Sequence, residues 1–91
     1  MKRFVIERHI PGVGRLNQAQ YKELAATSNA AAATLKGQVQ WVQSQITTDN
    51  TFCVYLGPSE DLIREHSRIA GFPITRVNEV VIVIDPMTAF S

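Results

Sequence analysis

The sequence has one cysteine, no long apolar run and almost no net charge, and each shortage excludes a class of protein. One cysteine among 91 residues cannot form an internal disulfide, so we expect a reducing, cytoplasmic location rather than a secreted disulfide scaffold. The N-terminal stretch MKRFVIERH lacks the apolar core of a signal peptide, and no segment approaches the roughly 18 apolar residues of a membrane span. Nine basic and eight acidic side chains are scattered along the chain, which argues against a nucleic-acid or membrane partner.

The length fits a single domain, residues 1–91, with the apolar fraction of an ordinary globular protein. A chain this small buries only roughly two-thirds of the surface that its unfolded form exposes. Its core is therefore thin, and pairing with a second copy would bury more apolar surface.

The stretch 40–56, QWVQSQITTDNTFCVYL, carries the clearest pattern. Polar and apolar residues alternate on both sides of Asp49-Asn50, which is typical of a β-hairpin. A three-residue loop, 49–51, separates the two kinds of side chain best, because it sets Ile46 opposite Val54 and Gln45 opposite Tyr55. One face is then aliphatic. The other face, where we look for a site, carries Trp41, Gln43, Gln45, Cys53 and Tyr55.

The remaining elements complete a simple order. A first strand is predicted over 3–9, a helix over 18–36 behind the capping pair Asn17 and Gln20, a second helix between Ser59 and Gly71, and a last strand over 77–84. The order strand, helix, strand, strand, helix, strand is the split βαβ arrangement of an α+β domain. It predicts an antiparallel sheet in the order fourth, first, third, second strand, with both helices on one face.

The predicted sheet has one aliphatic face, which the helices are expected to cover. That face holds Phe4, Ile6, Val42, Ile46, Phe52 or Val54, Val80 and Ile82. The opposite face holds Val5, Glu7, His9, Trp41, Gln43, Gln45, Cys53, Tyr55, Glu79, Val81 and Val83. This second face is too apolar to be left to water and yet contains polar side chains. We therefore expect a homodimer of the α/β-barrel type, in which two sheets enclose a partly polar cavity.

Glu7 and His9 are the strongest candidate site residues. They stand two apart on one strand, so both side chains leave the same face about 6–7 Å apart. A carboxylate and an imidazole at this spacing can bind one cation or transfer a proton. The alternative is a glutamate that lines a polar cavity beside an idle histidine. Cys53 shares its face with Tyr55, but no CxxC, HxxxH or HExxH spacing is present.

His66 falls in the middle of the apolar stripe of the second helix, three residues after Ile63 and three before Ile69. A histidine there needs a partner for each ring nitrogen, and we expect a main-chain carbonyl or a carboxylate. Trp41 is expected to form the wall of a cavity or of the dimer interface.

The pieces FVIERHIPG, TFCVY, PSEDLIREHSRIAGFP and RVNEVVIVIDP resemble a family of small, mostly uncharacterised bacterial proteins. The family has a ferredoxin-like fold and includes a nickel-binding protein. The resemblance implies a homodimer with transition-metal ligands, matched in this sequence by Glu7, Tyr55 and His66. The family often has histidine where this chain has Gln43, and an amide is a weaker nickel ligand than imidazole.

Two functions stay open at this point, beside the purely structural alternative that the polar face is only an interface. The first is a small dimeric binding protein for nickel, another divalent metal or a small ligand. Its metal residues would be Glu7, His9, Cys53 and His66, and its ligand-binding residues Trp41, Gln43 and Tyr55. The second is a cofactor-free dimeric enzyme, such as a monooxygenase or an isomerase of small cyclic compounds. It would use His9 or Glu7 as general base beside an apolar wall of Trp41 and Val81.

Overall fold

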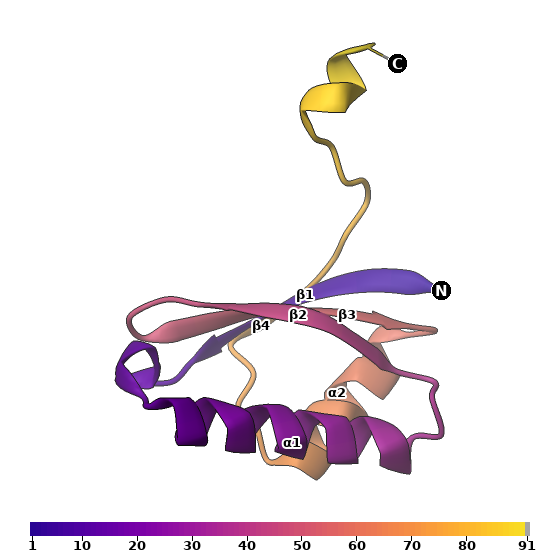
Figure 1. Cartoon of the computed structure of the whole chain (residues 1–91). Coiled ribbons are helices and arrows are strands. Elements are labelled where there is room, and N and C mark those ends of the chain that lie inside the picture. The colour runs from indigo at the N-terminus through magenta and orange to yellow at the C-terminus, as the bar shows by residue number, and fades with distance from the viewer. Residues whose placement is uncertain (91) are drawn as a thin grey trace.

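The computed structural model describes residues 1–90. The elements are β1 (Lys2–His9), η1 (Val13–Arg15), α1 (Gln18–Thr34), β2 (Gln40–Ile46), β3 (Asn50–Gly57), α2 (Glu60–Ala70), β4 (Arg76–Glu79) and η2 (Pro86–Phe90). The strands form one antiparallel sheet in the order β2-β3-β1-β4, and both helices lie on one of its faces (Figure 1). The predicted ferredoxin-like fold and strand order are therefore confirmed. Within the described residues, no helix is long and apolar enough to cross a membrane.

Both helices begin where their capping residues predict. The side chain of Asn17 accepts a hydrogen bond from the backbone N–H of Gln20, and the Gln20 side chain accepts one from the backbone N–H of Asn17. This reciprocal pair satisfies two backbone donors at the start of α1. Ser59 caps α2 through the N–H of Leu62, and Gly71 ends α2 with the positive φ of 77° that favours glycine.

The core lies between the sheet and the two helices. Its buried apolar side chains come from both central strands, from α2 and from the segment before β2: Phe4, Ile6, Val39, Cys53, Tyr55 and Ile63. Burying a large side chain of this kind stabilises the fold by about 1.5–3 kcal/mol. The layer beneath the sheet is thus the only place where this chain has a packed interior among residues 1–90.

The predicted register of the β2–β3 hairpin is wrong. Ile46 pairs with Thr51 and Gln45 with Phe52, and a bulge at Val42 brings Trp41 opposite Tyr55. The bulge places one extra residue on β2, so both Trp41 and Ser44 face the helices, where the indole N–H donates to the Ser44 hydroxyl over 3.0 Å.

The two faces of β3, together with Trp41, are consequently exchanged relative to the prediction, whereas Ser44 and Ile46 face the helices and Gln43 and Gln45 the open side, as predicted. Cys53, Tyr55 and Trp41 lie beneath the helices rather than on the open face. The open face instead carries the side chains of β3 that were assigned to the core, Phe52 and Val54, which are half-buried. The pairing of β1 with β3 is consistent with this arrangement. Phe4 pairs with Tyr55 and Ile6 with Cys53, so these four side chains share the helix-covered face.

Contacts from a distant loop hold the hairpin turn in this register. Thr48 and Asp49 accept backbone N–H bonds from Gly14 and Ile10, and the Asp49 carboxylate accepts from the N–H of Gly12. The connection between β1 and α1 therefore decides where the hairpin turns.

The last strand is shorter than predicted. β4 ends at Glu79, and residues 80–90 leave the sheet on the side opposite to the helices as an extended arm that ends in η2 (Figure 1). Glu79 pairs with Phe4, and the N–H of Val80 bonds the carbonyl of Arg3, close to the start of β1. The ladder with β1 ends there, and neither Val80 nor Ile82 joins the core as predicted.

Candidate functional site

A chain of polar contacts crosses the open face at the end of β1. The Asn50 amide donates from Nδ2 to Glu7 Oε2 over 3.0 Å, and Asn50 Oδ1 lies 3.2 Å from His9 Nδ1. Glu7 and His9 leave β1 on the same face, as predicted, and Asn50 pairs directly with His9 in the ladder between β1 and β3. The structure thus gathers a carboxylate and an imidazole around one amide.

The hydrogen-bonding groups of Glu7 and Asn50 fix the tautomer of His9. A carboxylate only accepts hydrogen bonds, so the Asn50 NH₂ group must face Glu7 and its oxygen must face His9. An amide oxygen also only accepts, so Nδ1 of His9 carries a proton. The neutral ring therefore keeps a free lone pair on Nε2, the form that binds a metal while the other nitrogen is held by an oxygen.

The predicted metal residues do not meet at one place. Glu7 and His9 lie on the open face, whereas Cys53 and His66 lie beneath the helices. Among residues 1–90, no three side chains of the His, Cys, Asp and Glu types form a group that could hold a metal ion. A single copy of the chain therefore offers Glu7 and His9 as a pair.

His66 is a buried core residue with one hydrogen bond. Its Nε2 lies 3.0 Å from the carbonyl oxygen of Ser28, as expected, whereas Nδ1 lacks the expected partner among residues 1–90. Its ring lies 4.9 Å from that of Tyr55. Burial raises the pKa of the Tyr55 phenol, although the bond to Ser28 and the charge of Arg8 oppose that rise. Tyr55 is therefore a neutral phenol at physiological pH, shielded from the open face.

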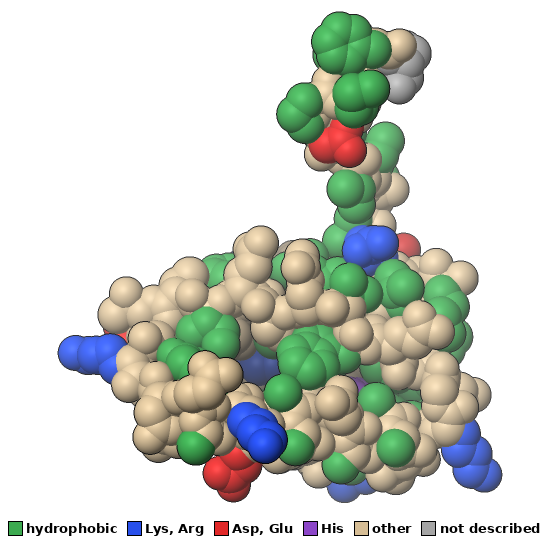
Figure 2. Space-filling view, viewed as in Figure 1, with side chains coloured by type: hydrophobic (Ala, Val, Ile, Leu, Met, Phe, Trp, Pro, Cys, Tyr) green, Lys and Arg blue, Asp and Glu red, His purple; other side chains and the backbone are tan. Residues whose placement is uncertain are grey.

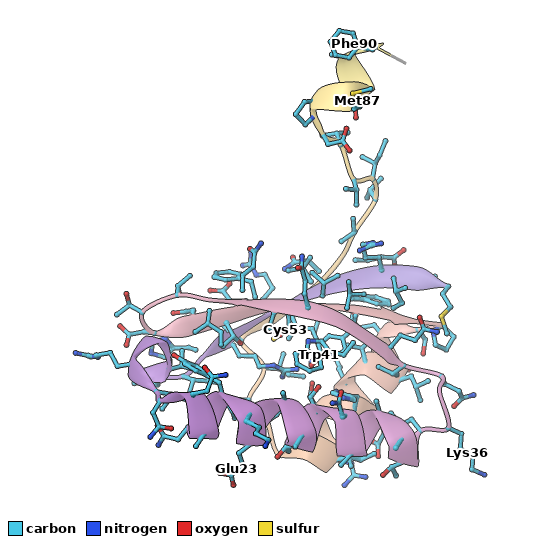
Figure 3. The ribbon with its side chains drawn as sticks, in the orientation of Figure 1. Glu23, Lys36, Trp41, Cys53, Met87 and Phe90 are labelled. Carbon is cyan, nitrogen blue, oxygen red and sulfur yellow. The ribbon has the colours of Figure 1, made fainter. Side chains whose placement is uncertain are left out.

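A cavity of about 250 Å³ lies between α1 and the underside of the sheet. Its walls include Tyr21, Trp41, Cys53 and Phe72, and its one charged lining residue is Arg8. Trp41 and Tyr55 both border it, whereas Gln43, the third predicted ligand-binding residue, is exposed and pairs with Val54 on the other face. Figure 3 shows Trp41 and Cys53 between the sheet and α1.

Comparison with known proteins gives a family. A model described as "Nickel responsive protein SCO4226-like" matches residues 4–80. The chain belongs to the SCO4226-like family. The crystal structure of SCO4226 from Streptomyces coelicolor A3(2) is similar in fold, with a TM-score of 0.76 and 16% sequence identity over 90% of this chain and 99% of that chain. No functionally curated protein matches the sequence.

In this SCO4226-like protein, the arrangement needed for the cofactor-free enzyme is absent from the described part of the chain. That function required an apolar pocket beside Glu7 or His9, walled by Trp41 and Val81. Trp41 instead lines a cavity on the opposite side of the sheet, and Val81 is 96% exposed on the arm. The walls of the cavity contain neither glutamate nor histidine, so it offers no general base of the expected kind.

Two residues of the SCO4226-like chain were not singled out from the sequence. The sequence predicts Asn50 in the hairpin loop, and only the ladder between β1 and β3 places its amide between Glu7 and His9. Arg8 follows Glu7 on β1, and its side chain leaves the strand on the opposite face. Its side chain lies beneath the helices and donates a hydrogen bond to the carbonyl of Pro73.

Proposed function

We propose that this SCO4226-like protein is a homodimeric binding protein for nickel or a similar divalent metal, with Glu7 and His9 as ligands. The observation that carries the proposal is the Glu7–Asn50–His9 chain. The amide holds Nδ1 of His9 and one oxygen of Glu7, which leaves Nε2 and the second carboxylate oxygen free to coordinate. Imidazole and carboxylate are ligands that suit nickel, and the family description points to the same metal.

One copy of the chain supplies too few donors for a nickel site. Nickel commonly takes a square-planar or tetragonal set of nitrogen and oxygen ligands, which needs about four donors or more. Glu7 and His9 supply two. A two-fold symmetric dimer would bring a second pair or complete each site with water.

The open face and the arm both support a dimer. The open face carries half-buried apolar side chains from the two central strands: Val5, Phe52, Val54 and Leu56. The arm, seen in Figure 2 as a column of mostly hydrophobic side chains, is exposed along its length. Its large exposed side chains are Val81, Ile82, Val83, Ile84, Met87 and Phe90. Soluble monomers rarely leave such a contiguous apolar segment in water.

The dimensions of the arm suit a second copy. Six extended residues, 80–85, reach about 20 Å at the rise of a strand, and four strands span about 15 Å from edge to edge. Because the arm leaves on the side of the open face (Figure 1), it can lie across or beside the sheet of a partner seated there. Two copies would then exchange arms and bury both open faces.

Calorimetric titration of tag-free protein with NiCl₂ tests the metal site. We expect binding by the unaltered chain, and a loss of affinity of about tenfold or more in Glu7→Gln and in His9→Asn, since one ligand interaction is worth at least about 1.4 kcal/mol. Glu79→Gln is the matched control, because it removes an exposed carboxylate that pairs with Lys2 away from Asn50. A flat titration of the unaltered chain, or equal affinity in all three variants, would reject the assignment.

A further inference from the structure

Arg8 is a buried cation without an anion. Its side chain is 2% exposed, beneath the helices in the middle of the core layer. Nη1 donates to the carbonyl oxygen of Pro73 over 2.8 Å, but Nε and Nη2 have no hydrogen-bond partner among residues 1–90. The ion pairs found within that range join exposed side chains elsewhere on the surface.

The surroundings of Arg8 compensate its charge only in part. The guanidinium lies 5.2 Å from the ring centre of Phe72 and 5.9 Å from that of Tyr55, at cation–π distances. The Tyr55 phenol also interacts with the guanidinium, which opposes the rise of its pKa, but it makes no hydrogen bond of normal geometry with Nε or Nη2. A buried charge with unsatisfied donors is costly, and proteins usually meet that cost with an anion or with hydrogen bonds. The side chain is thus prepared for an acceptor that the described chain itself does not supply.

Arg8, with its free Nε and Nη2 donors, lines the 250 Å³ cavity beneath the sheet. A basic side chain is visible at the bottom of the hollow between the sheet and α1 in Figure 2, in agreement with Arg8 being the one charged residue in its lining. Aromatic and aliphatic groups form most of the wall, among them Leu24, Trp41 and Ile46. The cavity therefore combines one cationic end with an apolar body.

A second, more open cleft borders this cavity. The cleft shares Tyr21, Ser44 and Ile46 with the cavity and continues to Arg15 and Thr48. Arg15 is exposed in this cleft and adds a second positive charge beside the cavity.

We propose that the cavity binds a small organic carboxylate with an apolar body, whose carboxylate pairs with Nε and Nη2 of Arg8. A guanidinium presents adjacent N–H groups in the geometry that a carboxylate accepts. The apolar walls favour a hydrocarbon body over a polar one, and a cavity just below the usual size of ligand pockets favours a single ring or a short branched chain. This site lies on the opposite side of the sheet from Glu7 and His9, so it is independent of the proposed metal site.

The single tryptophan of the chain reports on this cavity, because Trp41 lines it. We would titrate the protein with 3-phenylpropionate, with the neutral analogue 3-phenylpropanamide and with inorganic phosphate, and follow the fluorescence of Trp41. We expect saturable binding of the carboxylate with a dissociation constant of about 1 mM or tighter. The neutral amide and phosphate are expected to bind at least about tenfold more weakly, since the first lacks the charge and the second the apolar body.

Variants of Arg8 test the assignment. Arg8→Met should reduce carboxylate affinity at least about tenfold, while Arg3→Met, on the other face of the same strand, should leave it unchanged. If Arg8→Met does not fold, Arg8→Lys is measured in its place. It is expected to bind the carboxylate several-fold more weakly than the unaltered protein, because lysine keeps the charge but lacks the adjacent N–H groups of a guanidinium. Unchanged Trp41 fluorescence with the carboxylate, equal binding of its amide, tighter binding of phosphate, or undiminished affinity in the Arg8 variant would each overturn the proposal.

Discussion

Nε2 of His66 lies 3.0 Å from the carbonyl oxygen of Ser28, and this hydrogen bond joins α2 to α1 inside the core. The carbonyl only accepts, so Nε2 carries the proton, and Nδ1 has no hydrogen-bond partner within residues 1–90. Burial lowers the pKa of His66, the bond to Ser28 opposes that change, and the positive charge of Arg8 adds to it. The folded protein therefore holds His66 in its neutral form.

The stability of the protein should fall as the pH drops below neutrality. His66 has a lower pKa in the folded state than its ordinary value of about 6.5, so the unfolded chain binds more protons between these two values. The stabilisation is complete above about pH 6.5 and is lost as the pH falls toward the folded pKa. Thermal unfolding between about pH 7.5 and pH 5 should show it, since each 1 kcal/mol lowers the Tm of a domain this size by about 4–8 °C.

His66→Gln should flatten the dependence of stability on pH, because the glutamine amide can donate to the carbonyl of Ser28 and does not titrate. His9→Asn is the control, since it removes the exposed histidine, and the dependence should persist in it. Arg68 lowers the pKa of Glu65 by hydrogen bonding, so Glu65 titrates at more acidic pH and falls outside the measured range. An equally steep dependence in His66→Gln would contradict this account.

Asn50→Ala should weaken nickel binding without removing a ligand. The Asn50 amide orients Glu7 and His9, and partners of this kind commonly change metal affinity by about 10- to 100-fold. Calorimetric titration would measure the loss, and Asn78→Ala, a change on the edge strand β4, is the matched control. If Asn50→Ala binds nickel as tightly as the unaltered chain, the amide does not position the ligands.

The arm should control association between copies. Val81→Glu combined with Val83→Glu adds two charges to side chains that are 96% and 67% exposed, so it should leave the Tm at low protein concentration within a few degrees of the parent. It should raise the dissociation constant of the dimer about tenfold or more in sedimentation experiments, because the charges would lose water at the interface. Ala33→Glu, on the exposed side of α1, should not change association. Equal sedimentation of all three proteins would refute a role for the arm.

Gly14→Ala should destabilise the fold by about 1–3 kcal/mol, the usual cost of overpacking. A Cβ atom at this position would lie 2.5 Å from the carbonyl oxygen of Thr47 and 2.8 Å from Cα of Thr48, both backbone atoms that cannot move independently. Urea unfolding would measure the change. Gly37→Asn serves for comparison, because a side chain there meets open space and asparagine tolerates its φ of 78°. A loss at position 14 no greater than at position 37 would show that the contact can relax.

Local signals were sufficient for the elements and their order. Asn17 with Gln20, Ser59 and Gly71 bound the helices where the sequence predicts, because capping depends on residues within one turn. The pairing of Glu7 with His9 on one face follows in the same way from the two-residue period of a strand.

The hairpin shows why the faces of the sheet could not be predicted in the same way. Alternation along β2 and β3 predicts two faces but leaves open which one the helices cover, and a shift of the turn or a bulge exchanges them. Hydrogen bonds from Gly14 and Gly12 to the turn, and the bulge at Val42, decided the matter. These contacts join residues more than thirty positions apart, so no local pattern records them.

The sequence by itself determined the helices, the strands of the sheet and the hydrophobic character of residues 80–84, since each depends on neighbours along the chain. Only the tertiary structure decided that Arg8, Tyr55 and Trp41 lie together beneath the helices and that Asn50 joins Glu7 to His9. It also left the apolar residues 81–84 outside the sheet. Pairing and burial depend on which distant backbone groups are free to bond, and that is a property of the whole fold.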